Sequence, residues 1–219
     1  MFGPNPGAVH PNPAVPSLCF IKNTITSANM IVGDYTYYDD PVDSEHFQES
    51  VTHHYEFLGD RLIIGKFCAI ARGVTFIMNG ANHRMCSATT YPFNIMGGGW
   101  EKSTPRLEEL PFKGDTVIGN DVWIGERVTF LPGARVGDGA IIGAGAVVAG
   151  KIPAYAVAVG NPCRVVKKRF DEETIRRLLE LRWWDWPAEK IFASLEALTS
   201  ADMTALLAEA RKADGVSKD

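Results

Sequence analysis

The stretch "IGNDVWIGERVTFLPGARVGDGAIIGAGAVVAGKIPAYAVAV", residues 118–159, repeats with a period of six residues. The first place of each hexapeptide is apolar and the fifth is small or β-branched. An α-helix has 3.6 residues per turn, so it could not keep both places on one stripe, and it would not tolerate a glycine in nearly every turn. The pattern therefore excludes a helix. The first places are Ile118, Ile124, Phe130, Val136, Ile142, Val148 and Ala154, and the fifth places are Val122, Val128, Ala134, Ala140, Ala146, Ile152 and Ala158.

This period matches the hexapeptide repeat of a parallel β-helix, in which three short strands complete one coil of about eighteen residues. The apolar first residue points inward, and glycine at the second place permits backbone angles that a Cβ would obstruct. The same period is present earlier, led by Leu58, Ile64, Ile70 and Phe76, and "VGDYTY" from Val32 suggests a further coil. We therefore predict a mainly β fold whose coils bury their apolar residues by stacking on one another.

Two segments interrupt the period, at about residues 39–57 and 79–115. The second is rich in Gly, Pro, Asn and aromatic residues, which predicts a loop that leaves the coil and returns to it. Long loops inside compact domains tend to carry function. We expect residues 1–170 to form one domain with these two excursions, and we regard His83, in "NGANHRM", as a candidate functional residue.

The composition becomes helical after residue 170, and we predict a C-terminal helical segment over residues 171–213. Asp171 can cap "EETIRRLLELRWW", Pro187 suits the first turn of "PAEKIFASLEAL", and Ser200 can cap "ADMTALLAEARK". We expect these helices to cover the open end of the coil or a neighbouring subunit, and we expect the residues from Asp214 onward to be disordered.

Composition argues against several classes of partner. The formal net charge is -4 without a block of one sign, which disfavours nucleic acid. No apolar run approaches ~20 residues, so we expect no membrane span. The four cysteines, Cys19, Cys68, Cys86 and Cys163, have no regular spacing, which indicates neither a zinc site nor a disulfide framework. We expect Cys68, at a fifth place, to be a packing residue, and we expect a cytoplasmic protein.

Four motifs carry a resemblance to a known family. "NGANHRM", "STPRLEELPFKGDTVIGNDVWIG", "GNPCRVVKKRF" and "WWDWP" stand in the order seen in the hexapeptide xenobiotic acetyltransferases. The resemblance covers nearly the whole chain and is greatest to the streptogramin A acetyltransferases, with type B chloramphenicol acetyltransferases as relatives. It implies a left-handed parallel β-helix, a homotrimer with active sites between subunits, and acetyl-CoA as co-substrate. The left hand comes from the resemblance alone, because crossovers between parallel strands are usually right-handed.

The family's reaction needs a base for the acceptor hydroxyl, a positioned thioester and stabilisation of the oxyanion. Histidine suits the first task near neutral pH. The resemblance implies that His83 is this base, and that the acceptor oxygen attacks acetyl-CoA directly without an acyl-enzyme.

The resemblance also implies the residues that bind the two substrates. We expect an aromatic and apolar lining to hold the acceptor, with His54 beside it in an unassigned role. The pantetheine arm of CoA would bond to backbone groups of two residues that we expect to stack one above the other, eighteen residues apart, and basic residues would meet the CoA phosphates. The acceptor residues are Tyr37, Tyr55, Pro105, Leu110 and Trp123; the CoA residues are Ala140, Ala158, Arg164, Lys167 and Lys168.

Three alternatives remain open at this point. The acceptor could be chloramphenicol or another hydroxylated small molecule. A zinc enzyme of the carbonic anhydrase type would need three converging histidines, and His53 and His54 do not match a ligand spacing with His83. A non-catalytic trimeric scaffold would not depend on His83.

Overall fold

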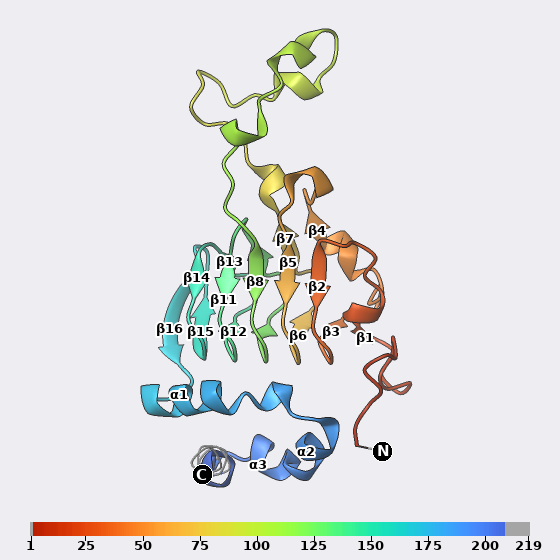
Figure 1. Cartoon of the computed structure of the whole chain (residues 1–219), viewed down its shortest axis with the longest axis vertical. Helices are drawn as coiled ribbons and strands as arrows, with labels where there is room; N and C mark the ends of the chain where they lie inside the picture. The colour runs from red at the N-terminus through yellow and green to blue at the C-terminus, as the bar shows by residue number, and fades with distance from the viewer. Residues whose placement is uncertain (1, 209–219) are drawn as a thin grey trace, which may run out of the picture.

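The computed structural model describes residues 2–208 and forms a parallel β-helix of stacked coils with a long loop on one side (Figure 1). Three sheets form its walls. Sheet A contains β1 (Leu18–Phe20), β3 (Tyr37–Asp39), β6 (Ala69–Ala71), β9 (Trp123–Ile124), β12 (Ile141–Ile142), β15 (Ala156–Val159) and β16 (Arg164–Lys168). Sheet B contains β2 (Met30–Val32), β5 (Leu62–Ile64), β8 (Thr116–Ile118), β11 (Arg135–Val136) and β14 (Lys151–Ile152). Sheet C contains β4 (Val51–Thr52), β7 (Thr75–Ile77), β10 (Thr129–Phe130) and β13 (Val147–Val148).

Apart from Leu58 and Ala154, the predicted first places of the hexapeptides lie in the core. Ile64 lies opposite Ile118, and Phe76 lies opposite Phe130, with the two rings stacked 4.6 Å apart. Val32 lies opposite Ile64, so the further coil suggested by "VGDYTY" is present. The predicted fold class is confirmed: a mainly β structure with a left-handed parallel β-helix, a protruding loop and a C-terminal helical segment.

The hexapeptide count changes at the corner between β13 and β14. Ile152 lies opposite Val136, and Ala158 lies opposite Ile142, sixteen residues earlier. The step from Val148 to the next inward residue is therefore four residues, so Ile152 and Ala158 occupy first places. The prediction that Ala154 is a first place was wrong, because the short corner moves the register by two residues.

Both excursions are mostly irregular and contain short 3₁₀ helices, and the first also contains β4, which pairs with β7 in sheet C. Residues 79–115 leave the coil after β7, return at β8 and extend well beyond the coil in Figure 1. Leu58, expected to lead a hexapeptide, instead ends a 3₁₀ turn outside the coil. The 3₁₀ helices of the coil and its excursions are η1 (Ile21–Asn23), η2 (Phe47–Ser50), η3 (Glu56–Leu58), η4 (Asn79–Ala81), η5 (Phe93–Ile95), η6 (Trp100–Ser103) and η7 (Leu107–Glu109).

The C-terminal segment begins as predicted. Asp171 caps α1 (Glu172–Leu181), accepting a 2.7 Å hydrogen bond from the Thr174 amide. Pro187 precedes α2 (Ala188–Ala193) as its N-cap, and the single helix expected there is divided into α2 and α3 (Leu195–Thr199). Ser200 ends α3, and the next helical residues start at position 204. The predicted helical residues 209–213 and the tail from Asp214 lie outside the described residues.

These helices lie along the side of the coil, and the prediction that they cover its open end was wrong (Figure 1). Phe170 contacts Tyr155 near the last coil, whereas η8 (Trp183–Asp185) reaches an earlier coil through a Phe67–Trp183 ring contact of 4.8 Å. The apolar face of α1 accounts for this position, because Ile175 and Leu178 pack in one buried cluster with Tyr155 of the coil. Within residues 2–208, no helix is long and apolar enough to cross a membrane.

Candidate functional site

The loop of residues 79–115 is held at its base by a buried polar cluster. The Asp60 side chain is fully buried, and its Oδ2 accepts hydrogen bonds from the Asn79 amide at 2.9 Å and from Asn79 Nδ2 at 2.7 Å. Asn79 in turn contacts the returning end of the loop, because its Nδ2 donates to Gly114 O and its Oδ1 accepts from the Lys113 amide. We call this group, Asp60, Asn79, Lys113 and Gly114, the neck.

His83 lies four residues after Asn79 of the neck and is exposed. Its Nδ1 lies 2.7 Å from the carbonyl oxygen of Thr90. A carbonyl can only accept, so Nδ1 carries the proton in this bond, and the neutral ring keeps its lone pair on Nε2. The arrangement fixes the tautomer and leaves Nε2 free to take a proton from a hydroxyl.

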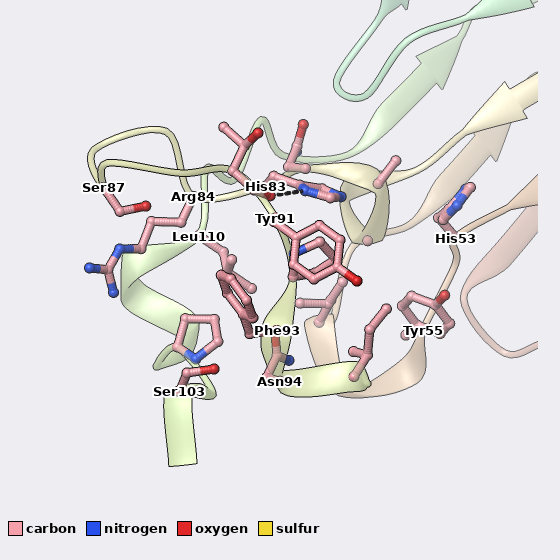
Figure 2. Close-up of a pocket in the computed structure, with 18 of the residues that line it drawn as sticks. His53, Tyr55, His83, Arg84, Ser87, Tyr91, Phe93, Asn94, Ser103 and Leu110 are labelled. Carbon is pink, nitrogen blue, oxygen red and sulfur yellow. Dashed lines mark hydrogen bonds between the residues drawn. The ribbon is translucent and has the colours of Figure 1, made fainter. Parts of the chain in front are cut away.

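A cavity of about 750 Å³ opens beside His83. Four of the six residues predicted to act on the acceptor line it: Tyr55, His83, Pro105 and Leu110. In Figure 2, Tyr55 and Leu110 lie on either side of the cavity, and the dashed line marks the bond from His83 to Thr90. The lining mixes aromatic and apolar side chains with a few polar groups, as is typical of small-molecule sites.

The other two predicted acceptor residues lie elsewhere on this chain. Tyr37 and Trp123 do not line the cavity. They stand on the outer face of sheet A, on either side of Ala69. Trp123 projects outward from the last place of a hexapeptide, as expected, and is 57% exposed. A single chain therefore presents the predicted acceptor residues on two separate surfaces.

Sequence reasoning missed several residues of the cavity. Tyr91, Phe93 and Ile95 line it, and the Phe93 ring packs on Tyr91 at 4.7 Å and on Trp100 at 5.0 Å. The signal was the run "YPFNI", residues 91–95, which places three large apolar side chains in a loop that has no core to bury them. Clusters of this kind on exposed loops indicate binding surfaces.

The alanines predicted to contact CoA are not stacked on one another, so that expectation was wrong. Ala158 lies opposite Ile142, because the short corner removes two residues from the coil. The side chains of both Ala140 and Ala158 are fully buried. Their carbonyl oxygens accept hydrogen bonds within the coil from the amides of Trp123 and Gly143. A role for their backbone groups in binding CoA stays a prediction.

The three basic residues predicted to meet the CoA phosphates lie together on β16, whose five residues are all exposed. Lys167 lies opposite Val157, and Lys168 forms an ion pair with Glu172. Arg164 donates a 2.9 Å hydrogen bond to Cys163 O. Their side chains are accessible for an anion at the C-terminal edge of sheet A.

His54 does not line the cavity. Its Nε2 lies 2.9 Å from the carbonyl oxygen of Asp60, so its contact is with the neck. Cys68 is fully buried, as expected for a packing residue, and burial raises the pKa of its thiol to about 12. Within residues 2–208, no three His, Cys, Asp or Glu side chains converge as a metal site would require.

The chain is similar to several known acetyltransferases. Residues 115–150 match the bacterial transferase hexapeptide model of six repeats. A probable macrolide acetyltransferase of Lysinibacillus sphaericus is 59% identical over 173 residues, which is 78% of this chain and 96% of the relative. The virginiamycin A acetyltransferase of Staphylococcus aureus is 47% identical over 93% of this chain and 92% of its own length.

A third relative, a chloramphenicol acetyltransferase of Agrobacterium fabrum, is 42% identical over 85% of this chain and 90% of its own length. Among solved structures, a galactoside acetyltransferase in complex with coenzyme A is 25% identical over 67% of this chain and 58% of that one, with a TM-score of 0.41.

Proposed function

The chain belongs to the hexapeptide-repeat xenobiotic acetyltransferases, and on this basis we propose that it moves acetyl from acetyl-CoA to a hydroxyl of a streptogramin A antibiotic. The observation that carries the proposal is the hydrogen bond from His83 Nδ1 to Thr90 O beside an apolar cavity. This bond leaves Nε2 as the proton acceptor at the place where an acceptor hydroxyl would enter.

In the proposed reaction, the acceptor oxygen attacks the thioester carbonyl while its proton moves to His83 Nε2. The resulting tetrahedral intermediate collapses, the bond from carbon to sulfur breaks, and the CoA thiolate leaves. The protonated imidazole then returns the proton to sulfur. Thr90 O stabilises the imidazolium that forms between these steps, since it already accepts from Nδ1.

No cysteine is needed in this sequence. A thiol whose pKa is about 12 is not a nucleophile near neutral pH, which excludes Cys68 from that role. Cys86, although exposed, does not line the cavity. Direct attack is therefore the route that the described residues favour.

The proposed active unit is a homotrimer. The loop surface beside His83 and the sheet A surface of Tyr37 and Trp123 each supply only part of the predicted acceptor lining on one chain. Packing of one protomer's loop against a neighbour's sheet A would bring the two parts together. This accounts for a tryptophan that is more than half exposed on the wall of an otherwise well-packed coil.

Acetyl-CoA would lie along the outer face of sheet A in this arrangement. Arg164, Lys167 and Lys168 on β16 would meet its phosphates, and backbone groups near Ala140 and Ala158 would bond to the pantetheine arm. The exposed basic side chains at the end of that sheet support the assignment.

A second candidate acceptor is a macrolide, because the relative that is 59% identical is described as a probable macrolide acetyltransferase. Chloramphenicol is a third, through the relative that is 42% identical. All three are hydroxylated antibiotics, so the chemistry at His83 would be the same and only the fit to the cavity would differ.

The test is a CoA-release assay with purified protein and three acceptors side by side: a streptogramin A compound, a macrolide and chloramphenicol. We expect the highest kcat/KM with the streptogramin. A higher value with either other acceptor would assign the chain to that acceptor. No CoA release with any of them would contradict the proposed function and favour a scaffold role.

A further inference from the structure

We propose that Asp60 is a positioning residue for the transfer reaction, acting through the neck to hold His83 beside its cavity. The inference rests on the proposed role of His83 as the base. Asp60 lies just before β5 on the coil, touches neither the cavity nor His83, and no motif of the sequence pointed to it.

The neck ties both ends of the loop to the coil. Asp60 Oδ2 accepts two bonds from Asn79, from the amide and from Nδ2. Asn79 also connects to the returning end of the loop, because its side chain bonds to the Lys113 amide at 2.7 Å and to Gly114 O at 2.9 Å. Through Asn79, one buried carboxyl group therefore fixes the segment that leaves the coil and the segment that returns to it.

Only three residues separate Asn79 from His83. Asn82 Nδ2 donates to Pro111 O at 2.9 Å and lies 3.3 Å from Asn79 Oδ1. At Gly80, an added Cβ would lie 2.4 Å from His53 O and 2.5 Å from the Tyr55 ring. The backbone that precedes His83 is thus tied at positions 79, 80 and 82, so the position of the neck determines the position of the imidazole.

The Asp60 side chain has few partners besides Asn79. Its carboxylate has no cationic partner within ion-pair distance among the described residues, and its Oδ1 accepts no hydrogen bond from them. By contrast, the neighbouring carboxylate Asp115 pairs with Arg61 at 2.8 Å. A fully buried carboxylate without a counter-ion is costly. The two hydrogen bonds from Asn79 are therefore the contacts that hold the Asp60 carboxyl group in place.

Two measurements on Asp60→Ala test the proposal. Amide hydrogen exchange of the free protein reports on the neck at residues 79–83 and 111–114 without requiring activity. Steady-state kinetics separates kcat from the KM for acetyl-CoA. We expect faster exchange at the neck, a fall in kcat of about 10²-fold and an unchanged KM for acetyl-CoA, because a displacement of the base by about 1 Å has this consequence. Asp60→Asn keeps one acceptor oxygen for Asn79. We expect its exchange rate at the neck and its kcat to lie between those of Asp60→Ala and those of the parent.

The matched control is Asp34→Asn, which changes an exposed carboxylate paired with Lys22 on another coil and should alter neither reading. If Asp60→Ala does not fold, Asn79→Ala takes its place; it removes the Nδ2 bond to Asp60 and the side-chain bonds to Lys113 and Gly114, and it keeps the backbone amide bond to Asp60. Parent-like kcat in a folded variant would overturn the proposal, as would a loss of thermal stability with kcat per folded molecule unchanged. If exchange at the neck rises but the parent protein acetylates none of the three antibiotics, the proposed function fails and the assignment of the neck stands.

Discussion

The coil and the loop of residues 79–115 are built on opposite principles. The inward side chains of the coil are almost fully buried, and Ile70, Phe76 and Phe130 expose none of their surface. Within residues 79–115, only Asn79 is buried. Each turn of the coil buries its inward side chains in the same way. The side chains of the loop stay accessible to solvent, and aromatic, apolar and imidazole groups among them surround a cavity. The buried core and the candidate site are therefore located in different parts of the chain, as is common where a rigid scaffold carries functional loops.

Glycines show the same difference at the level of single atoms. At Gly65, an added Cβ would lie 2.6 Å from the backbone of Gly119 in the next coil. At Gly98, in the loop, a Cβ would meet nothing within 4 Å, and only the φ of +67° requires glycine. In the coil, glycine permits the close approach of neighbouring backbones, and in the loop it permits a turn.

The largest effect on stability is expected from Phe130→Ala. This ring is fully buried and stacks on Phe76, so its removal leaves a cavity that the stacked coils cannot close. We expect a loss of about 4 kcal/mol in the free energy of unfolding, measured by chemical denaturation. A loss below about 1 kcal/mol would show that the coil relaxes around cavities and is less rigid than its packing indicates.

The next effect depends on pH and concerns the corner under the C-terminal helices. Burial raises the pKa of Asp121 to about 6. The folded state therefore binds the proton more tightly than the unfolded chain, and stability falls as pH rises from about 4 to about 6. We expect the free energy of unfolding of Asp121→Asn to rise by about 2 kcal/mol relative to that of the parent as the pH increases across this range. Thermal or chemical unfolding at pH 4, 5, 6 and 7 checks this, and a constant difference between the two proteins would contradict it.

Trp100→Ala is the counterpart of Phe130→Ala in the loop. Trp100 is 48% exposed and packs on Phe93, which lines the cavity. We expect the melting temperature to change little and the KM for the acceptor to rise about fivefold, since one aromatic contact contributes on the order of 1 kcal/mol. A large drop in melting temperature would mean that the loop shares in the stability of the coil, and the contrast between the two regions would fail.

The smallest effect is expected for Lys167→Ala on β16. An exposed ammonium contributes modestly to binding a phosphate, so the KM for acetyl-CoA should rise by about threefold at low salt and by less at high salt. The acceptor KM provides the internal control and should stay constant. If the acceptor KM changes instead, the edge of sheet A belongs to the acceptor site.

Periodic parts of the fold could be predicted from the sequence, because a buried first place every six residues leaves a trace that can be counted. The short corner after Val148 could not, because Ile152 and Ala158 are also apolar at the places assigned to them under an unbroken count. The position of α1 depends on which corner offers apolar surface, and the pattern of the helix alone does not contain that information.

The candidate site divides in a similar way. His83 was predicted from its motif, and the structure adds the Thr90 carbonyl that orients it. The wall of Tyr91, Phe93 and Ile95 was missed, because a loop has no period to reveal which side chains converge. Asp60 was missed because a carboxylate next to a strand normally indicates a surface turn, and only its contact with Asn79 shows otherwise.

The claim on which the account depends is that His83 removes the acceptor proton, and its most direct test is the kcat of His83→Ala. The comparison requires a variant whose melting temperature and oligomeric state match those of the parent. We predict a loss of about 10² to 10⁴ in kcat with little change in the KM for acetyl-CoA, as expected when a general base is removed. Turnover within about threefold of the parent would contradict the assignment of His83 as the base.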